Sequence, residues 1–186
     1  MKNNMKILII FLTVIFLALS STGCNKSSGG IGEPDPVSGG KVVGTNKDAP
    51  KEIESRELNS FTAVFYLYAQ DDGEKDSAYF FEVKEDENGL ITITESRAYN
   101  VSCESDRHIF EELQKIIEKY NWAELNGTDE YTAGLPPEYQ PCCFNAVYES
   151  GESIYFRQDN DPNDPASREI LKLLESEFAA HGADCF

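Results

Sequence analysis

The sequence predicts an α+β fold of two layers, in which an antiparallel sheet of about five strands has two helices on one face. Runs rich in Val, Ile, Phe, Tyr and Thr are separated by turn residues, as in strands and hairpins. Two later segments have the 3.6-residue spacing of amphipathic helices. The order of these elements is βββα followed by ββα, which fits one domain from residue 52 to residue 186.

Three strand-like runs come first, at residues 61–69, 77–85 and 90–97. The first two are separated by Asp-Asp-Gly at residues 71–73, and the next two by Glu-Asn-Gly at residues 87–89. Asn-Gly is a strong hairpin signal, so the three runs are expected to form an antiparallel meander.

The first helix is predicted from its apolar spacing, with Ser105 or Asp106 as the N-cap and Asn121 near the C-terminus. Its apolar positions are Ile109, Phe110, Leu113, Ile116, Ile117 and Tyr120. A second hairpin is expected at residues 144–157, with its turn at residues 149–152. The second helix begins at the N-cap Asp164 followed by Pro165, and its apolar face is Ile170, Leu171, Leu174 and Phe178.

The charge balance excludes one class of partner. Lys and Arg number 16 against 33 Asp and Glu, so the formal net charge is -17. Such a surface repels phosphate backbones and anionic lipid headgroups, and nucleic acid is therefore a poor partner.

The first residues have the layout of an export signal. Lys2 and Lys6 precede an apolar run, Ile7–Leu19, that is too short to span a bilayer comfortably. Small residues follow at positions 20–23 and lead to Cys24. Residues 1–23 are therefore predicted to be a signal peptide that is removed.

The residues Ser21-Thr22-Gly23-Cys24 resemble the lipobox of bacterial lipoproteins, although Ser21 stands where Leu is usual. The resemblance covers the leader alone. It implies a diacylglyceryl thioether on Cys24 and a location on the extracytoplasmic face of the cell membrane. Ordinary signal-peptidase cleavage at the same bond, which gives a freely secreted protein, is the alternative. Residues 24–51 are rich in Gly, Ser, Pro and Asn and are predicted to be a flexible tether that reaches roughly 25 to 30 Å.

Signatures of catalysis are mostly absent from the sequence. It contains neither G-x-S-x-G nor H-E-x-x-H, and the two histidines, His108 and His181, lie at predicted helix ends. No catalytic residue, metal or cofactor is therefore predicted. The acidic segment 159–164 has oxygen ligands at the first, third and fifth positions of a calcium loop, but it lacks the Gly and the terminal Glu.

Four cysteines follow Cys24, and an even number in an exported chain favours two disulfides. Adjacent side chains in a strand diverge, so Cys142 and Cys143 are not expected to pair with each other. Cys103 is expected to pair with one of them and Cys185 with the other. A zinc site that uses these thiols with His108 or His181, or four free thiols in a reducing habitat, are the alternatives.

The segment from residue 126 to residue 141 shows no clear secondary structure and is long for a loop in a small domain. Tyr131, Leu135 and Tyr139 are its candidate binding residues, because aromatic side chains between prolines make efficient contacts. The alternative is that these rings cover a sheet edge.

Small size, a tether and few catalytic residue types together favour a membrane-anchored binding module. Its partner is expected to be a protein or another ligand of the cell envelope, in addition to the membrane that holds the anchor. An envelope enzyme with an acidic site, and a thiol or metal-binding protein that uses the late cysteines, remain the alternatives.

Overall fold

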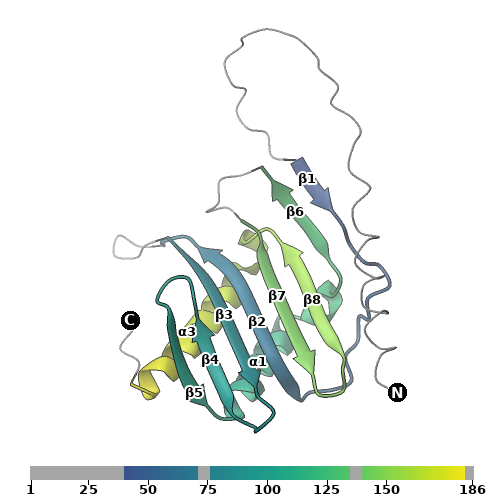
Figure 1. Ribbon diagram of the computed structural model, residues 1–186. Coiled ribbons are helices and arrows are strands. Elements are labelled where there is room, and N and C mark those ends of the chain that lie inside the picture. The colour runs from purple at the N-terminus through teal and green to yellow at the C-terminus, as the bar shows by residue number, and fades with distance from the viewer. Residues whose placement is uncertain (1–39, 71–75, 135–139, 183–186) are drawn as a thin grey trace, which may run out of the picture. The chain divides into compact units, whose positions relative to one another are not determined.

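The computed structural model describes residues 40–70, 76–134 and 140–182. Within these ranges eight strands form one mixed sheet in the order β1-β6-β8-β7-β2-β3-β4-β5, and helices cover one of its faces (Figure 1). The predicted α+β class and two-layer arrangement are confirmed. The prediction of about five antiparallel strands and two helices was wrong, because it missed three strands, one short helix and one parallel pairing.

The bounds of the elements follow the chain. The strands are β1 (Gly40–Val43), β2 (Leu58–Leu67), β3 (Ser77–Glu85), β4 (Ile91–Glu95), β5 (Val101–Ser105), β6 (Asp129–Ala133), β7 (Cys142–Tyr148) and β8 (Ser153–Gln158). The helices are α1 (His108–Lys119), α2 (Trp122–Leu125) and α3 (Asp164–Ala180), and the 3-10 turn η2 (Asp161–Asn163) precedes α3.

The predicted meander is present as β2, β3 and β4, which pair antiparallel with one another. The turn between β3 and β4 follows the Asn-Gly signal. Gly89 adopts a φ of 82° there, and its N–H donates to the carbonyl of Asp86 at 3.0 Å. A left-handed backbone of this kind is open to Gly at no steric cost, which explains why the signal is dependable.

Helices α1 and α3 begin close to their predicted starts. The predicted N-cap residues were wrong by one or two positions, because the N-cap is Arg107 in α1 and Asn163 in α3. The carboxylate of Asp106 accepts the N–H of His108 at 2.8 Å, and Asn121 at a φ of 51° ends the run after α1. Pro165 lies in the first turn of α3, where its missing N–H has no helical partner to lose. Across the described ranges, no helix is apolar over a length that would cross a bilayer.

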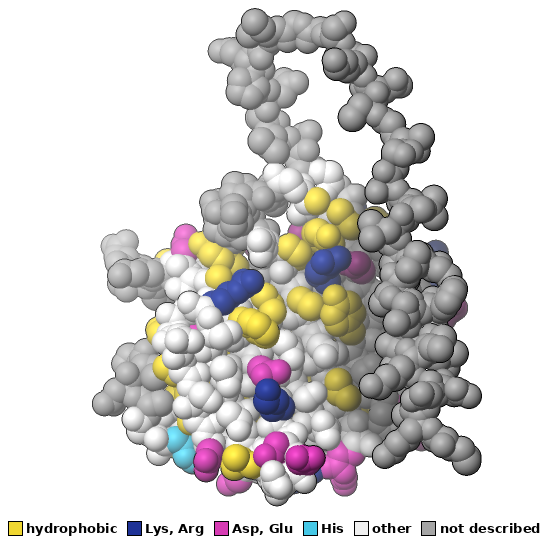
Figure 2. Space-filling model, in the orientation of Figure 1, with side chains coloured by type: hydrophobic (Ala, Val, Ile, Leu, Met, Phe, Trp, Pro, Cys, Tyr) yellow, Lys and Arg dark blue, Asp and Glu magenta, His cyan; other side chains and the backbone are white. Residues whose placement is uncertain are grey.

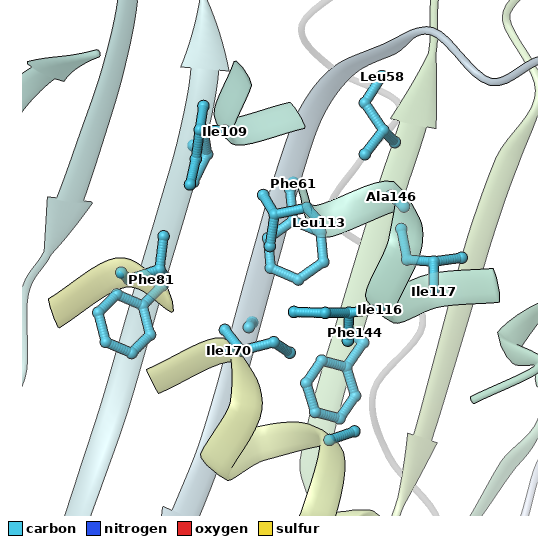
Figure 3. Close-up of a cluster of buried hydrophobic side chains, with 14 of the residues drawn as sticks. Leu58, Phe61, Phe81, Ile109, Leu113, Ile116, Ile117, Phe144, Ala146 and Ile170 are labelled. Carbon is cyan, nitrogen blue, oxygen red and sulfur yellow. The ribbon is translucent and has the colours of Figure 1, made fainter. Parts of the chain in front are cut away.

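The hydrophobic core lies between the sheet and the helices (Figure 3). Alternate residues of the strands point toward α1 and α3, and Phe61, Phe81 and Phe144 meet Leu113 and Ile170 there. The single tryptophan, Trp122 of α2, is 1% exposed. Its ring centroid lies 4.5 Å from that of Phe144, so α2 packs on the same face as the longer helices.

The sheet begins earlier than predicted. Residues 40–51, which the sequence assigned to the tether, belong to the domain. Strand β1 pairs antiparallel with β6, and the N–H of Gly44 donates to the carbonyl of Asp129 at 2.7 Å. The side-chain amide of Asn126 donates to the carbonyl of Pro50 at 2.9 Å. Residues 40–51 are therefore held against the rest of the domain by backbone and side-chain hydrogen bonds.

The packing of residues 40–51 against the edge of the sheet requires a glycine at position 127. Gly127 has a φ of 77°, and a Cβ at this position would lie 2.5 Å from both the Cβ of Ala49 and the carbonyl oxygen of Asn46. A side chain at position 127 would therefore displace the segment from the edge of the sheet.

Candidate functional site

The face of the sheet opposite α1 and α3, which we call the open face, is covered by no helix in the described residues (Figure 1). Hydrophobic side chains gather over its upper part in the orientation of the figures, with basic side chains among them (Figure 2). A group of exposed hydrophobic side chains on a folded domain marks a candidate contact surface, so this region is the candidate site.

A hollow opens on this face because β6 separates from β8. The two strands pair in parallel at only two positions, Asp129 with Arg157 and Glu130 with Gln158. Beyond them the N–H of Thr132 donates to Oδ1 of Asp159 at 2.9 Å, and its hydroxyl donates to Oδ2 at 3.1 Å. The Asp159 side chain thus takes the place of the next backbone hydrogen bond between β6 and β8, and it holds β6 away from β7 and β8.

We call this space the β6–β8 hollow. It measures about 400 Å³, within the range of small-molecule sites. The residues that line it come from β6, from the start of β7 and from β8. They are Tyr131, Thr132, Ala133, Gly134, Gln140, Pro141, Cys143, Tyr155 and Arg157.

Arg157 is the one charged residue among the described residues that line the hollow. Its Nε and one terminal nitrogen donate to the two carboxylate oxygens of Asp129 at 2.8 and 3.0 Å, and its guanidinium carbon lies 4.2 Å from the ring centroid of Tyr131. The hydrogen bonds to Asp129 raise the pKa of Arg157 above its already high value. A bidentate pair and a cation–π contact hold the guanidinium in one position.

Tyr155 and Cys143 continue the surface beside Arg157. Tyr155 is 44% exposed, more than any other described Phe, Tyr or Trp residue. A hydrogen bond between its hydroxyl and the Cys143 thiol raises the pKa of Tyr155 above its usual range, and partial burial of the ring adds a smaller effect in the same direction. The phenol therefore stays neutral at physiological pH and can both donate and accept hydrogen bonds.

The strand register places Arg157 and Cys143 in one row across the open face. Arg157 lies between Asp129 and Cys143, Cys143 pairs with Val64, and Val64 pairs with Phe80. Side chains in such cross-strand rows touch their neighbours. The row therefore changes from polar at β6 to apolar at β3.

The predicted binding residues have different outcomes. Tyr131 lines the hollow, whereas Leu135 and Tyr139 lie outside the described residues. The prediction that residues 126–141 lack secondary structure was wrong for Asp129–Ala133, which form β6. All five residues of β6 are half-buried, so the strand has no alternating apolar pattern that the sequence could reveal.

The predicted pairing of Cys103 with Cys142 or Cys143 was wrong. No disulfide joins these three residues in the structure. Four steps of the sheet separate β5 from β7, which is about 19 Å, whereas a disulfide needs Cα atoms within about 7 Å. Cys24 and Cys185 lie outside the described residues, so the predictions for the anchor and for the partner of Cys185 stay predictions.

The two adjacent cysteines point to opposite faces of β7, as expected. Cys142 is buried, and its thiol donates to the carbonyl of Gln158 at 3.2 Å. Burial raises the pKa of the Cys142 thiol to about 12, so this side chain behaves as a small hydrophobe. Cys143 faces the hollow.

The residues of segment 159–164, which resemble part of a calcium loop, form hydrogen bonds and ion pairs with other residues of the chain. Asp159 accepts from Thr132, Asn160 accepts the N–H of Tyr66 at 3.0 Å, and Asp164 pairs with Arg168 at 2.8 Å. Among the residues that the structure describes, no three His, Cys, Asp or Glu side chains are grouped as a metal site would require. The acidic segment thus has a structural role before α3.

Sequence reasoning missed Asp129, Tyr155 and Arg157. The alternation in β8 contained a usable signal, because buried Ile154 and Phe156 place Tyr155 and Arg157 on the opposite face. An outward aromatic residue two positions from an outward arginine is a pattern that the predicted hairpin already implied.

Comparisons with known proteins give no relative from which to transfer a role: no family model, no curated protein and no solved structure matches the chain.

Proposed function

We propose that this protein is a lipid-anchored, extracytoplasmic binding module whose contact surface is the open face around the β6–β8 hollow. The observation that supports the surface most is the position of Arg157, which two hydrogen bonds and the Tyr131 ring hold beside the exposed ring of Tyr155. A rigid aromatic and arginine cluster of this kind loses little conformational freedom when it binds, and such residues dominate binding energies.

The anchor rests on the leader and on the resemblance to a lipobox that ends at Cys24. With β1 starting at Gly40, the tether is shorter than the sequence alone suggested. A Gly/Ser-rich segment of this length reaches about 22 Å. The domain would thus stay within one domain diameter of the membrane, close to ligands of the cell envelope.

The anchor has a direct chemical test. Mass spectrometry of the protein from the membrane fraction is expected to show a diacylated N-terminal Cys24, and Cys24→Ala is expected to remove the lipid and leave the leader uncut or the protein soluble. A membrane-free wild-type protein whose N-terminal Cys24 is unmodified contradicts the anchor and favours secretion.

The contact surface is tested by saturable binding of the labelled full chain to isolated cell envelopes. Tyr155→Ala is expected to weaken binding about tenfold or more, because the most exposed ring of the surface is lost. Leu90→Ala is the matched control, since Leu90 is 42% exposed in the distant β3–β4 turn. Equal weakening by both variants, or by neither, contradicts the placement of the surface.

A further inference from the structure

The chemistry of the β6–β8 hollow points to a neutral saccharide as its ligand; this inference rests on the proposed function and names the class of molecule that the surface binds. Three properties of the hollow support it: the charge of the lining, its polar groups, and the backbone groups of the β6 edge that are already hydrogen-bonded.

The charge of the hollow favours an uncharged ligand. Among its described lining residues, Arg157 alone has a formal charge, and Asp129 neutralises that charge through two hydrogen bonds of 2.8 and 3.0 Å. An anionic ligand would meet an arginine already paired and a protein of net charge -17. A cationic ligand would find no carboxylate on the lining itself.

The polar groups exclude a purely apolar ligand. Gln140, Tyr155 and Arg157 line the wall, and the guanidinium of Arg157 has N–H groups beyond the two that Asp129 accepts. An apolar occupant would leave these remaining donors without water or a partner. Sugar hydroxyls both donate and accept, so they suit groups of both kinds. The exposed aromatic ring of Tyr155 can stack on the C–H face of a pyranose ring, and about 400 Å³ admits a mono- or disaccharide.

The strand edge argues against an extended peptide. A peptide that adds to a sheet needs free N–H and carbonyl groups along the edge. On the hollow side of β6, the N–H of Thr132 is already bonded to Asp159 at 2.9 Å. On the other wall, Pro141 has no N–H to donate. Recognition through side chains therefore fits this site better than recognition through the backbone.

The test is a saccharide titration followed by saturation-transfer NMR and calorimetry. The full chain is purified in a polyoxyethylene detergent, which has no sugar headgroup. The probes are glucose, galactose, mannose, N-acetylglucosamine and their common disaccharides, with glucuronic acid and glucosamine as charged counterparts. At least one neutral sugar is expected to bind, and its charged counterpart is expected to bind about tenfold more weakly.

Variants locate the bound sugar. Tyr155→Ala and Arg157→Gln are each expected to weaken binding about tenfold or more, whereas Tyr155→Phe keeps the stacking ring and loses less. Leu90→Ala is the matched control, because Leu90 is 42% exposed in the β3–β4 turn, away from the hollow, and it is expected to stay within about twofold of the wild type.

Two results overturn the inference. One is the absence of binding by every neutral sugar at concentrations of several millimolar, and the other is binding that Tyr155→Ala leaves unchanged. If the sugars fail while Tyr155→Ala still weakens binding to cell envelopes, the saccharide is wrong and the proposed binding surface stands. If both assays fail, the surface itself is wrong.

Discussion

Replacement of Glu95 by glutamine is expected to lower the free energy of unfolding by about 3 kcal/mol. Glu95 is fully buried at the end of β4, where its two carboxylate oxygens accept five backbone N–H groups. One comes from Phe80 of β3, and four come from residues 97–100, which connect β4 to β5. An amide NH₂ in place of either oxygen would point its hydrogens at these donors and leave them unpaired.

The same carboxylate makes the free energy of unfolding depend on pH. Burial acts to raise the pKa of Glu95, but the backbone hydrogen bonds from Tyr99, Ala98, Arg97 and Phe80 outweigh it and hold the pKa below its usual value of 4.5. The contribution of this group is therefore complete above pH 4.5 and is lost as the pH falls through the lower, folded-state pKa. The difference in the free energy of unfolding between the wild type and Glu95→Gln should therefore become smaller at acid pH.

Urea unfolding at pH 7 and at acid pH measures both effects. Glu82→Gln is the matched control, because Glu82 lies on the open face and pairs with Lys84 at 3.0 Å in solvent. Its loss is expected to cost less than about 1 kcal/mol. A Glu95→Gln variant as stable as the control at pH 7 would show that the carboxylate does not hold the β4–β5 connection.

Phe144→Ala is expected to cost about 4 kcal/mol, the largest effect of a single change in the core. Phe144 lies at the centre of β7 with no exposed surface, and its ring centroid is 4.5 Å from Trp122, 5.2 Å from Phe156 and 6.2 Å from Phe65. Its removal leaves a cavity where the sheet, α2 and α3 meet, and the surrounding rings cannot close it completely.

Fluorescence of Trp122, the single tryptophan, reports this change directly. Phe144→Ala should shift the native emission and lower the midpoint of urea unfolding. Phe80→Ala on the open face should leave the emission unchanged and the free energy of unfolding within about 1 kcal/mol of the wild type. A small loss for Phe144→Ala with unchanged emission contradicts the core as described.

The elements predicted correctly are those whose signals are local. The apolar spacing of Ile109 to Ile117 and the Asn-Gly turn before β4 lie within a few residues, so they are visible without knowledge of the fold. Strands β1 and β6 are visible only once they are paired, since β6 is polar and its partners lie far away in the chain.

The candidate site was predicted in part for the same reason. Tyr131 was identified from the composition of its segment, but the partners that make it part of a surface, Asp129 and Arg157, meet only through the parallel pairing of β6 with β8. The sequence also contains a signal for Glu95, because its alternation with Ile91 and Ile93 places it on the buried face of β4. An acid at a core position of a strand indicates a bonded carboxylate.

The central claim, that the protein binds through the open face at the β6–β8 hollow, is tested most directly by hydroxyl-radical footprinting of the full chain with and without saturating cell envelopes. Tyr155 and Tyr99 are exposed by 44% and 36%, so both are expected to be oxidised in the free protein. Bound envelope is expected to protect Tyr155 at least threefold and to leave Tyr99, near the opposite edge of the sheet, at its free rate. Protection of Tyr99 with Tyr155 still fully oxidised would contradict the claim.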